Sequence, residues 1–182
     1  MDKWSKLDNK CIVLIGPECS GKSTQARILT EESSGTLIKH VRIPDKFVLL
    51  NSVIRDIEHQ LTRTRLGVHG TVIFDRWQLT DDIIYEEYCY GEKSILLPLL
   101  PTLGATCREA NIQILYLTID RDEMISRLNA RGDKLRTLDE AIDTWNAYET
   151  FYSKNKYTLP IKRLDVTGMT VEQLTDSILD II

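Results

Sequence analysis

The chain has 182 residues, of which 42% are hydrophobic, and this is enough to bury a continuous core without a metal or disulfide. Its 23 basic and 27 acidic residues give a net charge of −4, which argues against a broad surface for nucleic acid or anionic membrane. The four cysteines form no CxxC pair, and the sequence shows neither a signal peptide nor an apolar run long enough to span a membrane. We therefore expect one cytoplasmic domain over residues 1–182, without a nucleic-acid or membrane partner.

The first half of the chain predicts strands that alternate with helices. Apolar, β-branched runs are typical of buried parallel strands, and apolar residues three or four apart indicate helices. In chain order, these patterns predict a strand at 10–15, a glycine-rich loop, a helix at 22–34, a strand at 36–43, a helix at 47–66, a short strand at 71–74 and a helix at 77–90. The apolar face of the long helix is expected to hold Phe47, Leu50, Ile54, Ile57 and Leu61.

The second half continues the alternation. It predicts a helix that ends near 110, a strand at 112–119, helices at 120–132 and 137–152, a strand at 161–166 and a last helix from 170. Asp120, Thr137 and Thr170 each stand three residues before a Glu or Gln, a pattern that caps the start of a helix. The whole series predicts a three-layer α/β/α fold with a five-stranded parallel sheet, whose sites lie at the carboxyl ends of the strands.

The residues from Gly16 to Ser23 read Gly-Pro-Glu-Cys-Ser-Gly-Lys-Ser and lie between a predicted strand and a predicted helix. Glycines at both ends of such a loop (P-loop) let backbone N–H groups converge on a phosphate at the helix N-terminus. Lys22 would reach the β- and γ-phosphates, and the Ser23 hydroxyl would ligate Mg²⁺. The motif predicts an ATP·Mg²⁺ site in a P-loop NTPase-type fold. The residues expected to bind ATP are Gly16, Pro17, Cys19, Ser20, Gly21, Lys22, Ser23 and Thr24.

Asp75 and Arg76 follow the third predicted strand, so they too fall at a strand end. A GTPase-like switch needs Asp-x-x-Gly at this place to sense the γ-phosphate, and that sequence is absent, which favours a small-molecule kinase. Two plainer interpretations stay open for the pair. Asp75 could cap the helix at 77–90, and Arg76 could be a surface charge that pairs with an acidic residue of that helix.

These motifs resemble the thymidylate kinase branch of the nucleoside monophosphate kinases over about residues 10–165. The loop from Ile15 to Gln25 is similar to the family's loop, including the carboxylate at Glu18 and the Ser-Thr-Gln at its end. Phe74-Asp75-Arg76, followed by Thr80, is similar to the family's Asp-Arg-aromatic-x-x-Ser segment.

Two further segments carry the resemblance. Arg127-x-x-x-Arg131-Gly-Asp, together with Arg136, resembles the arginine-bearing lid of the bacterial members, here at about residues 129–137. The segment from Arg42 to Lys46 is similar to the one that holds the acceptor monophosphate.

The resemblance implies catalytic roles for Lys22, Asp75, Arg76, Arg127, Arg131 and Arg136. Asp75 would hold Mg²⁺ together with Ser23, and Arg76 would clamp the acceptor phosphate in line with ATP. Cys19 stands where some members have a catalytic arginine, so the lid arginines would supply that charge. The implied acceptor site consists of Glu18 against the sugar 3′-hydroxyl, Lys46 and Arg76 against the phosphate, and Arg55 beside the base. Tyr85 is a further candidate, whose ring could stack on the base.

The resemblance implies a deoxynucleoside monophosphate kinase that moves the ATP γ-phosphate to a pyrimidine deoxynucleotide, dTMP or a related or modified dUMP. It also implies that the protein is a homodimer. Asn51, Ile84 and Tyr85 differ from the family's base-pocket residues, so a deoxynucleoside kinase or another small-metabolite kinase on the same fold is the alternative. A third hypothesis is a non-catalytic protein that binds ATP.

Overall fold

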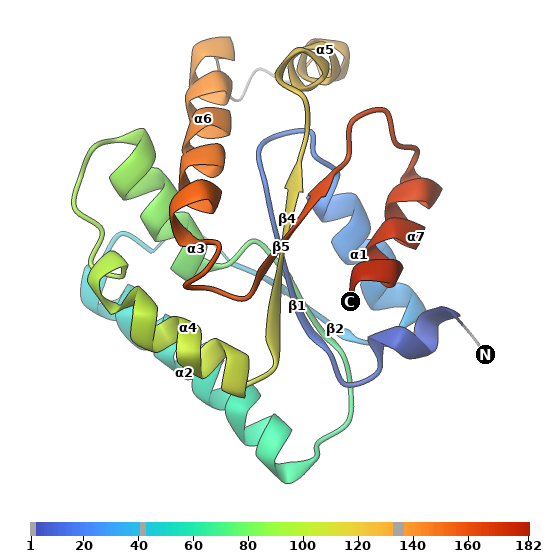
Figure 1. Cartoon of the computed structure of the whole chain (residues 1–182), viewed down its shortest axis with the longest axis vertical. Helices are drawn as coiled ribbons and strands as arrows, with labels where there is room; N and C mark the ends of the chain where they lie inside the picture. Colours follow the sequence, from blue (N-terminus) through green and yellow to red (C-terminus); the bar gives the residue numbers. More distant parts are fainter. Residues whose placement is uncertain (1–2, 41–42, 133–136) are drawn as a thin grey trace.

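The computed structural model describes residues 3–40, 43–132 and 137–182. Five parallel strands form one sheet in the order β2-β3-β1-β4-β5, and helices cover both of its faces (Figure 1). The strands are β1 (Cys11–Ile15), β2 (Thr36–Lys39), β3 (Val72–Asp75), β4 (Ile112–Thr118) and β5 (Ile161–Asp165). The predicted three-layer α/β/α fold with a five-stranded parallel sheet is confirmed.

The helices begin and end close to the predicted residues. They are α1 (Lys22–Glu32), α2 (Lys46–Leu66), α3 (Gln78–Asp82), α4 (Leu100–Glu109), α5 (Arg121–Arg131), α6 (Leu138–Asn155) and α7 (Val171–Ile181), with 3₁₀ turns η1 (Lys3–Leu7) and η3 (Leu97–Leu99) and a π-helical segment η2 (Ile83–Cys89). The predicted caps are confirmed. The Asp120 carboxylate accepts from two backbone N–H groups of α5, and Thr137 and Thr170 form complete capping boxes.

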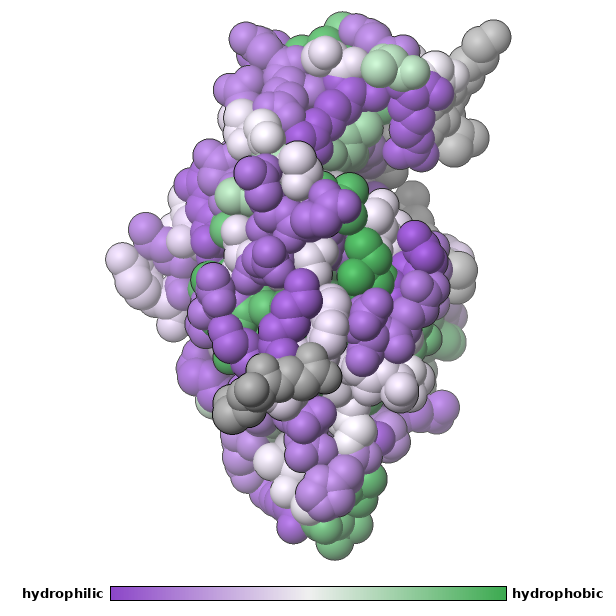
Figure 2. Space-filling model, turned by 90° about the vertical axis from the view of Figure 1, so that its right-hand side faces the viewer, coloured by the Kyte–Doolittle hydropathy of each residue, from purple (hydrophilic) through white to green (hydrophobic). Residues whose placement is uncertain are grey.

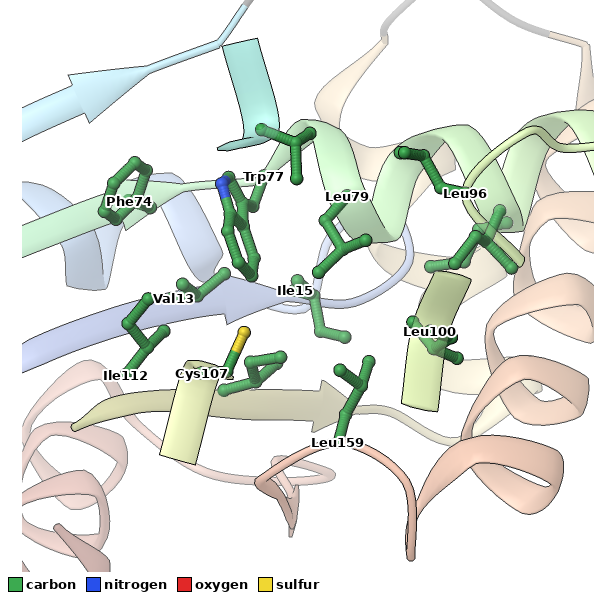
Figure 3. Close-up of a cluster of buried hydrophobic side chains, with 14 of the residues drawn as sticks. Val13, Ile15, Phe74, Trp77, Leu79, Leu96, Leu100, Cys107, Ile112 and Leu159 are labelled. Carbon is green, nitrogen blue, oxygen red and sulfur yellow. The ribbon is translucent and has the colours of Figure 1, made fainter. Parts of the chain in front are cut away.

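Strand β1 supplies side chains to two separate cores, because successive residues of a strand point to opposite faces of the sheet. Val13 and Ile15 point toward Trp77 and Leu79 in the core beneath α2, α3, α4 and α6 (Figure 3). Leu14, like Ile12, packs in the second core, beneath α1, α5 and α7. Both faces of the sheet are therefore covered, as the continuously apolar strands predicted.

The buried face of α2 differs from the predicted one. Its most buried side chains are Leu49, Val53, Ile57 and Gln60, whereas Phe47 is 73% exposed. Of the predicted stripe, Ile57 is buried and Leu50 and Leu61 pack against the core while partly exposed. The most buried stripe is turned around the helix axis from the predicted one, and it includes a glutamine. Hydrophobic spacing alone did not predict which stripe of α2 is buried, because the buried stripe also depends on where the neighbouring helices lie.

The segment predicted as one helix at 77–90 is divided. Helix α3 ends at Asp82 and passes into the π-helical segment η2, where the Tyr90 N–H donates to the Tyr85 carbonyl at 2.9 Å, five residues back. The wider turn changes which side chains of η2 share a face. Strand β2 is also shorter than predicted, because it ends at Lys39.

On the side of the molecule shown in Figure 2, the surface is mainly hydrophilic, and the hydrophobic side chains gather in small groups. Within the described residues, no helix combines the length and the hydropathy that crossing a membrane requires.

Candidate active site

The P-loop connects β1 to α1 and passes very close to β4. Gly16 has φ +151°, and a Cβ atom built on it would lie 2.2 Å from the Leu117 carbonyl oxygen, so only glycine fits there. Gly21 has φ +85° and caps the N-terminus of α1. The Ser20 hydroxyl donates to the Pro17 carbonyl at 2.9 Å and closes the turn. The loop thus ends at a helix N-terminus, the place where backbone N–H groups and the helix dipole favour an anion.

Lys22 lies folded over this loop. Its side chain is buried, and Nζ donates to the Pro17 carbonyl at 2.5 Å and to the Ser20 hydroxyl at 3.3 Å. Burial, followed by the positive charge of Arg76, lowers the pKa of Lys22 to about 7. A bound polyphosphate would place negative charge beside the Lys22 amine and so favour its protonated form.

Beside the loop lies a cavity of about 500 Å³, which we call the donor cavity. It is lined by Glu18, Cys19, Gly21, Lys22, Ser23 and Thr24 from the loop and the start of α1, and by Arg76, Arg127, Leu128 and Arg131. The other expected ATP-site residues, Gly16, Pro17 and Ser20, are buried and form the turn behind the lining residues.

Arg127 reaches from α5 across to the P-loop. Its Nη1 donates to the Cys19 carbonyl at 3.2 Å, and its Nη2 pairs with Glu123. The second oxygen of Glu123 accepts from the Gly168 N–H at 2.9 Å, which ties this arginine to the loop between β5 and α7. Arg131 lines the donor cavity one turn further along α5. Of the predicted lid at 129–137, residues 133–136, and with them Arg136, lie outside the described residues.

Asp75 lies at the end of β3, paired in register with Leu14 of β1, two residues before the P-loop begins. It is 3% exposed, its Oδ2 is 3.4 Å from Lys39 Nζ, and its Oδ1 has no hydrogen-bond partner within the described residues. The residue that caps α3 is Trp77, so the structure does not support the interpretation of Asp75 as a helix cap.

The oxygens of Asp75 and Ser23 suit Mg²⁺, a hard cation that proteins commonly hold through one or two side chains together with substrate phosphates and water. The Ser23 hydroxyl is exposed in the donor cavity, and one Asp75 oxygen is buried without a partner. No group of three or more His, Cys, Asp or Glu side chains in the described part of the chain could hold a metal alone. The residues therefore fit a metal ion that shares its ligands with a nucleotide.

Arg76 is the residue where the two halves of the site meet. Its Nη1 donates to the Tyr85 hydroxyl at 2.9 Å, and its Nη2 lies 3.8 Å from Glu18 Oε1. Its backbone has φ +72°, which is costly for a residue with a side chain, by about 1–3 kcal/mol, and is found mainly at functional sites. Arg76 contacts Glu18 and Tyr85, and within the described residues no ion pair joins it to an acidic residue of the segment at 77–90, the plainer interpretation that the sequence had left open.

A second cavity, of about 240 Å³, lies on the other side of Arg76, and we call it the acceptor cavity. It is lined by His40, Ile43, Leu49, Arg76, Gln78, Asp81, Asp82, Tyr85, Glu86 and Tyr90. Tyr85, which the sequence analysis expected beside the base, lines this cavity. Lys46, at the start of α2, reaches the rim, where its Nζ lies 2.7 Å from Glu86 and 3.4 Å from Asp82. Burial lowers the pKa of Lys46, but the hydrogen bond to Glu86 and the charge of Asp82 outweigh it, so the pKa is raised.

Two features of the acceptor cavity were not expected. Arg55 is exposed on α2 and lines neither cavity, although the sequence had placed it beside the base. Conversely, Asp81, Asp82 and Glu86 all line the cavity. The i, i+4 spacing of Asp82 and Glu86 was the available signal for a shared acidic face, but such charges more often point to solvent.

No protein-family model and no curated protein sequence matches the chain. Solved structures with similar folds do. The protein YorR from Bacillus subtilis, in complex with phosphorylated GDP, has a TM-score of 0.68 at 22% identity, over 94% of this chain and 95% of that chain.

Two kinases are also similar. Deoxyadenosine kinase from M. mycoides, with bound dCTP, has a TM-score of 0.59 at 19% identity, over 93% of this chain and 96% of that one. Thymidylate kinase from Candida albicans has a TM-score of 0.54 at 18% identity, over 95% of this chain and 90% of that one. These likenesses show that the chain has the P-loop fold of the nucleoside and nucleotide kinases.

Proposed function

We propose that the chain is a single-domain, ATP-dependent kinase that transfers the γ-phosphate of ATP·Mg²⁺ to a deoxynucleoside monophosphate in the acceptor cavity. The observation that carries this proposal is the position of Arg76, which lines both the donor and the acceptor cavity. A guanidinium there can contact the phosphates of both substrates and hold the attacking and leaving oxygens in line.

The other residues supply charge rather than a nucleophile. Lys22 binds the transferred phosphoryl group, while Arg127 and Arg131 add positive charge from α5 on the outer side of the donor cavity. Asp75 and Ser23 would hold Mg²⁺, which neutralises charge on the phosphates when it is bound. Phosphoryl transfer needs little beyond such positioning and electrostatics, because the attacking oxygen belongs to the acceptor.

A deoxynucleoside acceptor is the second candidate, and the charge of the acceptor cavity favours it. Three carboxylates line this cavity, while Arg76 and His40 are the basic side chains among its described lining residues. Lys46, expected to bind the acceptor phosphate, pairs with two of the carboxylates. A monophosphate brings further negative charge into this cavity, whereas a nucleoside brings none.

The test is the formation of ADP from ATP·Mg²⁺ with a panel of deoxynucleosides and their monophosphates. Turnover with monophosphates supports the first candidate, and turnover with nucleosides alone supports the second. The absence of acceptor-dependent ADP with every compound would overturn both and favour a non-catalytic ATP-binding protein. The Lys22→Ala variant controls for contaminating kinases. The predicted homodimer is tested separately, by measuring the mass of the protein in solution.

A further inference from the structure

Two of the three carboxylates in the acceptor cavity already have partners. Asp82 accepts from the Ser94 hydroxyl at 2.5 Å and lies 3.4 Å from Lys46 Nζ. Glu86 accepts from the same Lys46 at 2.7 Å. This small network joins the start of α2 to η2 and to the segment that follows it, and it explains the burial of both carboxylates without a ligand.

Asp81 differs from these two residues. Its Oδ1 is buried and has no hydrogen-bond partner within the described residues, although the side chain lines the cavity. Burial raises the pKa of Asp81 to about 6, even though Arg76, Lys22 and His40 act against this shift. A buried carboxyl oxygen without a donor is costly, so a ligand with an N–H group would relieve the cost.

The remaining walls describe the shape of such a ligand. Ile43 and Leu49 provide apolar surface, and the rings of Tyr85 and Tyr90 lie 6.3 Å apart at the side of the cavity. Apolar and aromatic walls with a few polar groups suit a flat heteroaromatic ring, and the polar groups then select its edge.

We propose that Asp81 binds the exocyclic amino group of the acceptor's base, so that the protein selects cytosine, adenine or guanine over thymine and uracil. This inference rests on the proposed function, and it departs from the thymine or uracil acceptor that the sequence resemblance implies. Thymine and uracil present a single N–H between two carbonyl oxygens. A carbonyl oxygen beside the Asp81 carboxylate is repelled, whereas an amino group donates to it.

The first experiment measures the dissociation constants of dCMP, dAMP, dGMP and dTMP, and of the corresponding nucleosides, by calorimetry without ATP. At least one amino-bearing compound should bind the wild-type protein about tenfold or more tightly than its thymine counterpart. The amino group can donate a hydrogen bond to the charged Asp81 carboxylate, and the thymine carbonyl cannot. Tighter binding of the thymine compound would overturn the inference. Binding is read without turnover, so an absence of kinase activity would reject the proposed function separately.

The second experiment uses Asp81→Asn, whose carboxamide can donate to a thymine carbonyl. The preference for the amino-bearing compound should fall about tenfold or more. Asp143→Asn makes the same chemical change on the exposed face of α6 and should leave the preference unchanged. An Asp81→Asn protein that is folded by circular dichroism and keeps the wild-type preference would contradict the role of Asp81.

Discussion

Nη2 of Arg76 lies 3.8 Å from Oε1 of Glu18, and this contact joins the end of β3 to the P-loop. Glu18 lines the donor cavity, and Arg76 lines both cavities. The contact therefore holds the guanidinium at the boundary between the two cavities, where the proposed phosphoryl transfer would take place.

Replacing Arg76 by lysine should lower kcat/KM about 100-fold or more for either substrate. Lysine keeps the positive charge but lacks the planar guanidinium, whose two Nη atoms contact Tyr85 and Glu18 at the same time. Steady-state kinetics with each substrate varied in turn would measure the effect. Arg27→Lys, at an exposed ion pair on α1, is the matched control and should have normal activity. Loss of activity toward only one substrate would contradict the shared role of Arg76.

Replacing Lys22 by alanine should reduce turnover about 100-fold or more and leave the protein folded. Within the described residues, the amine donates hydrogen bonds only to loop oxygens, so we expect its main contribution to be to the phosphoryl group. Activity and circular dichroism of the same preparation would be compared with those of Lys93→Ala, an exposed lysine. Normal turnover in Lys22→Ala would show that the assignment of the P-loop is wrong.

Binding of ATP at pH 8 should take up protons. The pKa of Lys22 is about 7 in the nucleotide-free protein, so the amine is mostly neutral at pH 8. The triphosphate favours its charged form and raises this pKa, so a proton enters on binding, and the uptake should diminish toward pH 6, where the free protein is already protonated. Calorimetry in two buffers of different ionisation enthalpy measures the uptake.

The groups whose charges act on Lys22 are Arg76, Glu18, Asp75 and Asp81. The matched variant for the proton measurement is Lys22→Arg, because the arginine side chain stays protonated between pH 6 and pH 8. It should bind ATP without the uptake at pH 8. An unchanged uptake in this variant would assign the proton to another group.

Replacing Gly16 by alanine should lower the free energy of unfolding by about 1–3 kcal/mol or more, because the added methyl group meets the Leu117 carbonyl at 2.2 Å. Gly91→Ala is the control, since Gly91 also has a positive φ, of +68°, but no neighbouring atom within 4 Å. It should lose only about 1 kcal/mol. Urea unfolding of the two variants separates the close approach from the backbone strain, and equal losses would argue against the close approach.

Much of the fold was predictable because local patterns determine it. All five strands were predicted, the central ones from their apolar runs, and the capping residues Asp120, Thr137 and Thr170 marked three helix starts. The P-loop and Asp75-Arg76 were found for the same reason, since each motif follows directly from a strand and the parallel sheet brings the strand ends together.

The acceptor cavity was less predictable because its residues depend on the rotation of helices. The family resemblance implied that Arg55 lies beside the base, but this arginine is exposed, while Leu49 on the same helix lines the cavity. Likewise, the change from α3 to a π-helical segment decides which acidic side chains enter the cavity, and sequence spacing does not report it.

Strand β1 carries the P-loop and packs into both cores, so this strand is exposed only when both cores open. Amide hydrogens of β1 should therefore exchange only on global unfolding. The acceptor cavity is formed instead by α2, α3 and η2, which cover a single face of the sheet. The proposed phosphate-binding side would thus rest on the part of the molecule that we expect to open most slowly, and the proposed base-binding side could diverge in sequence without loss of the fold.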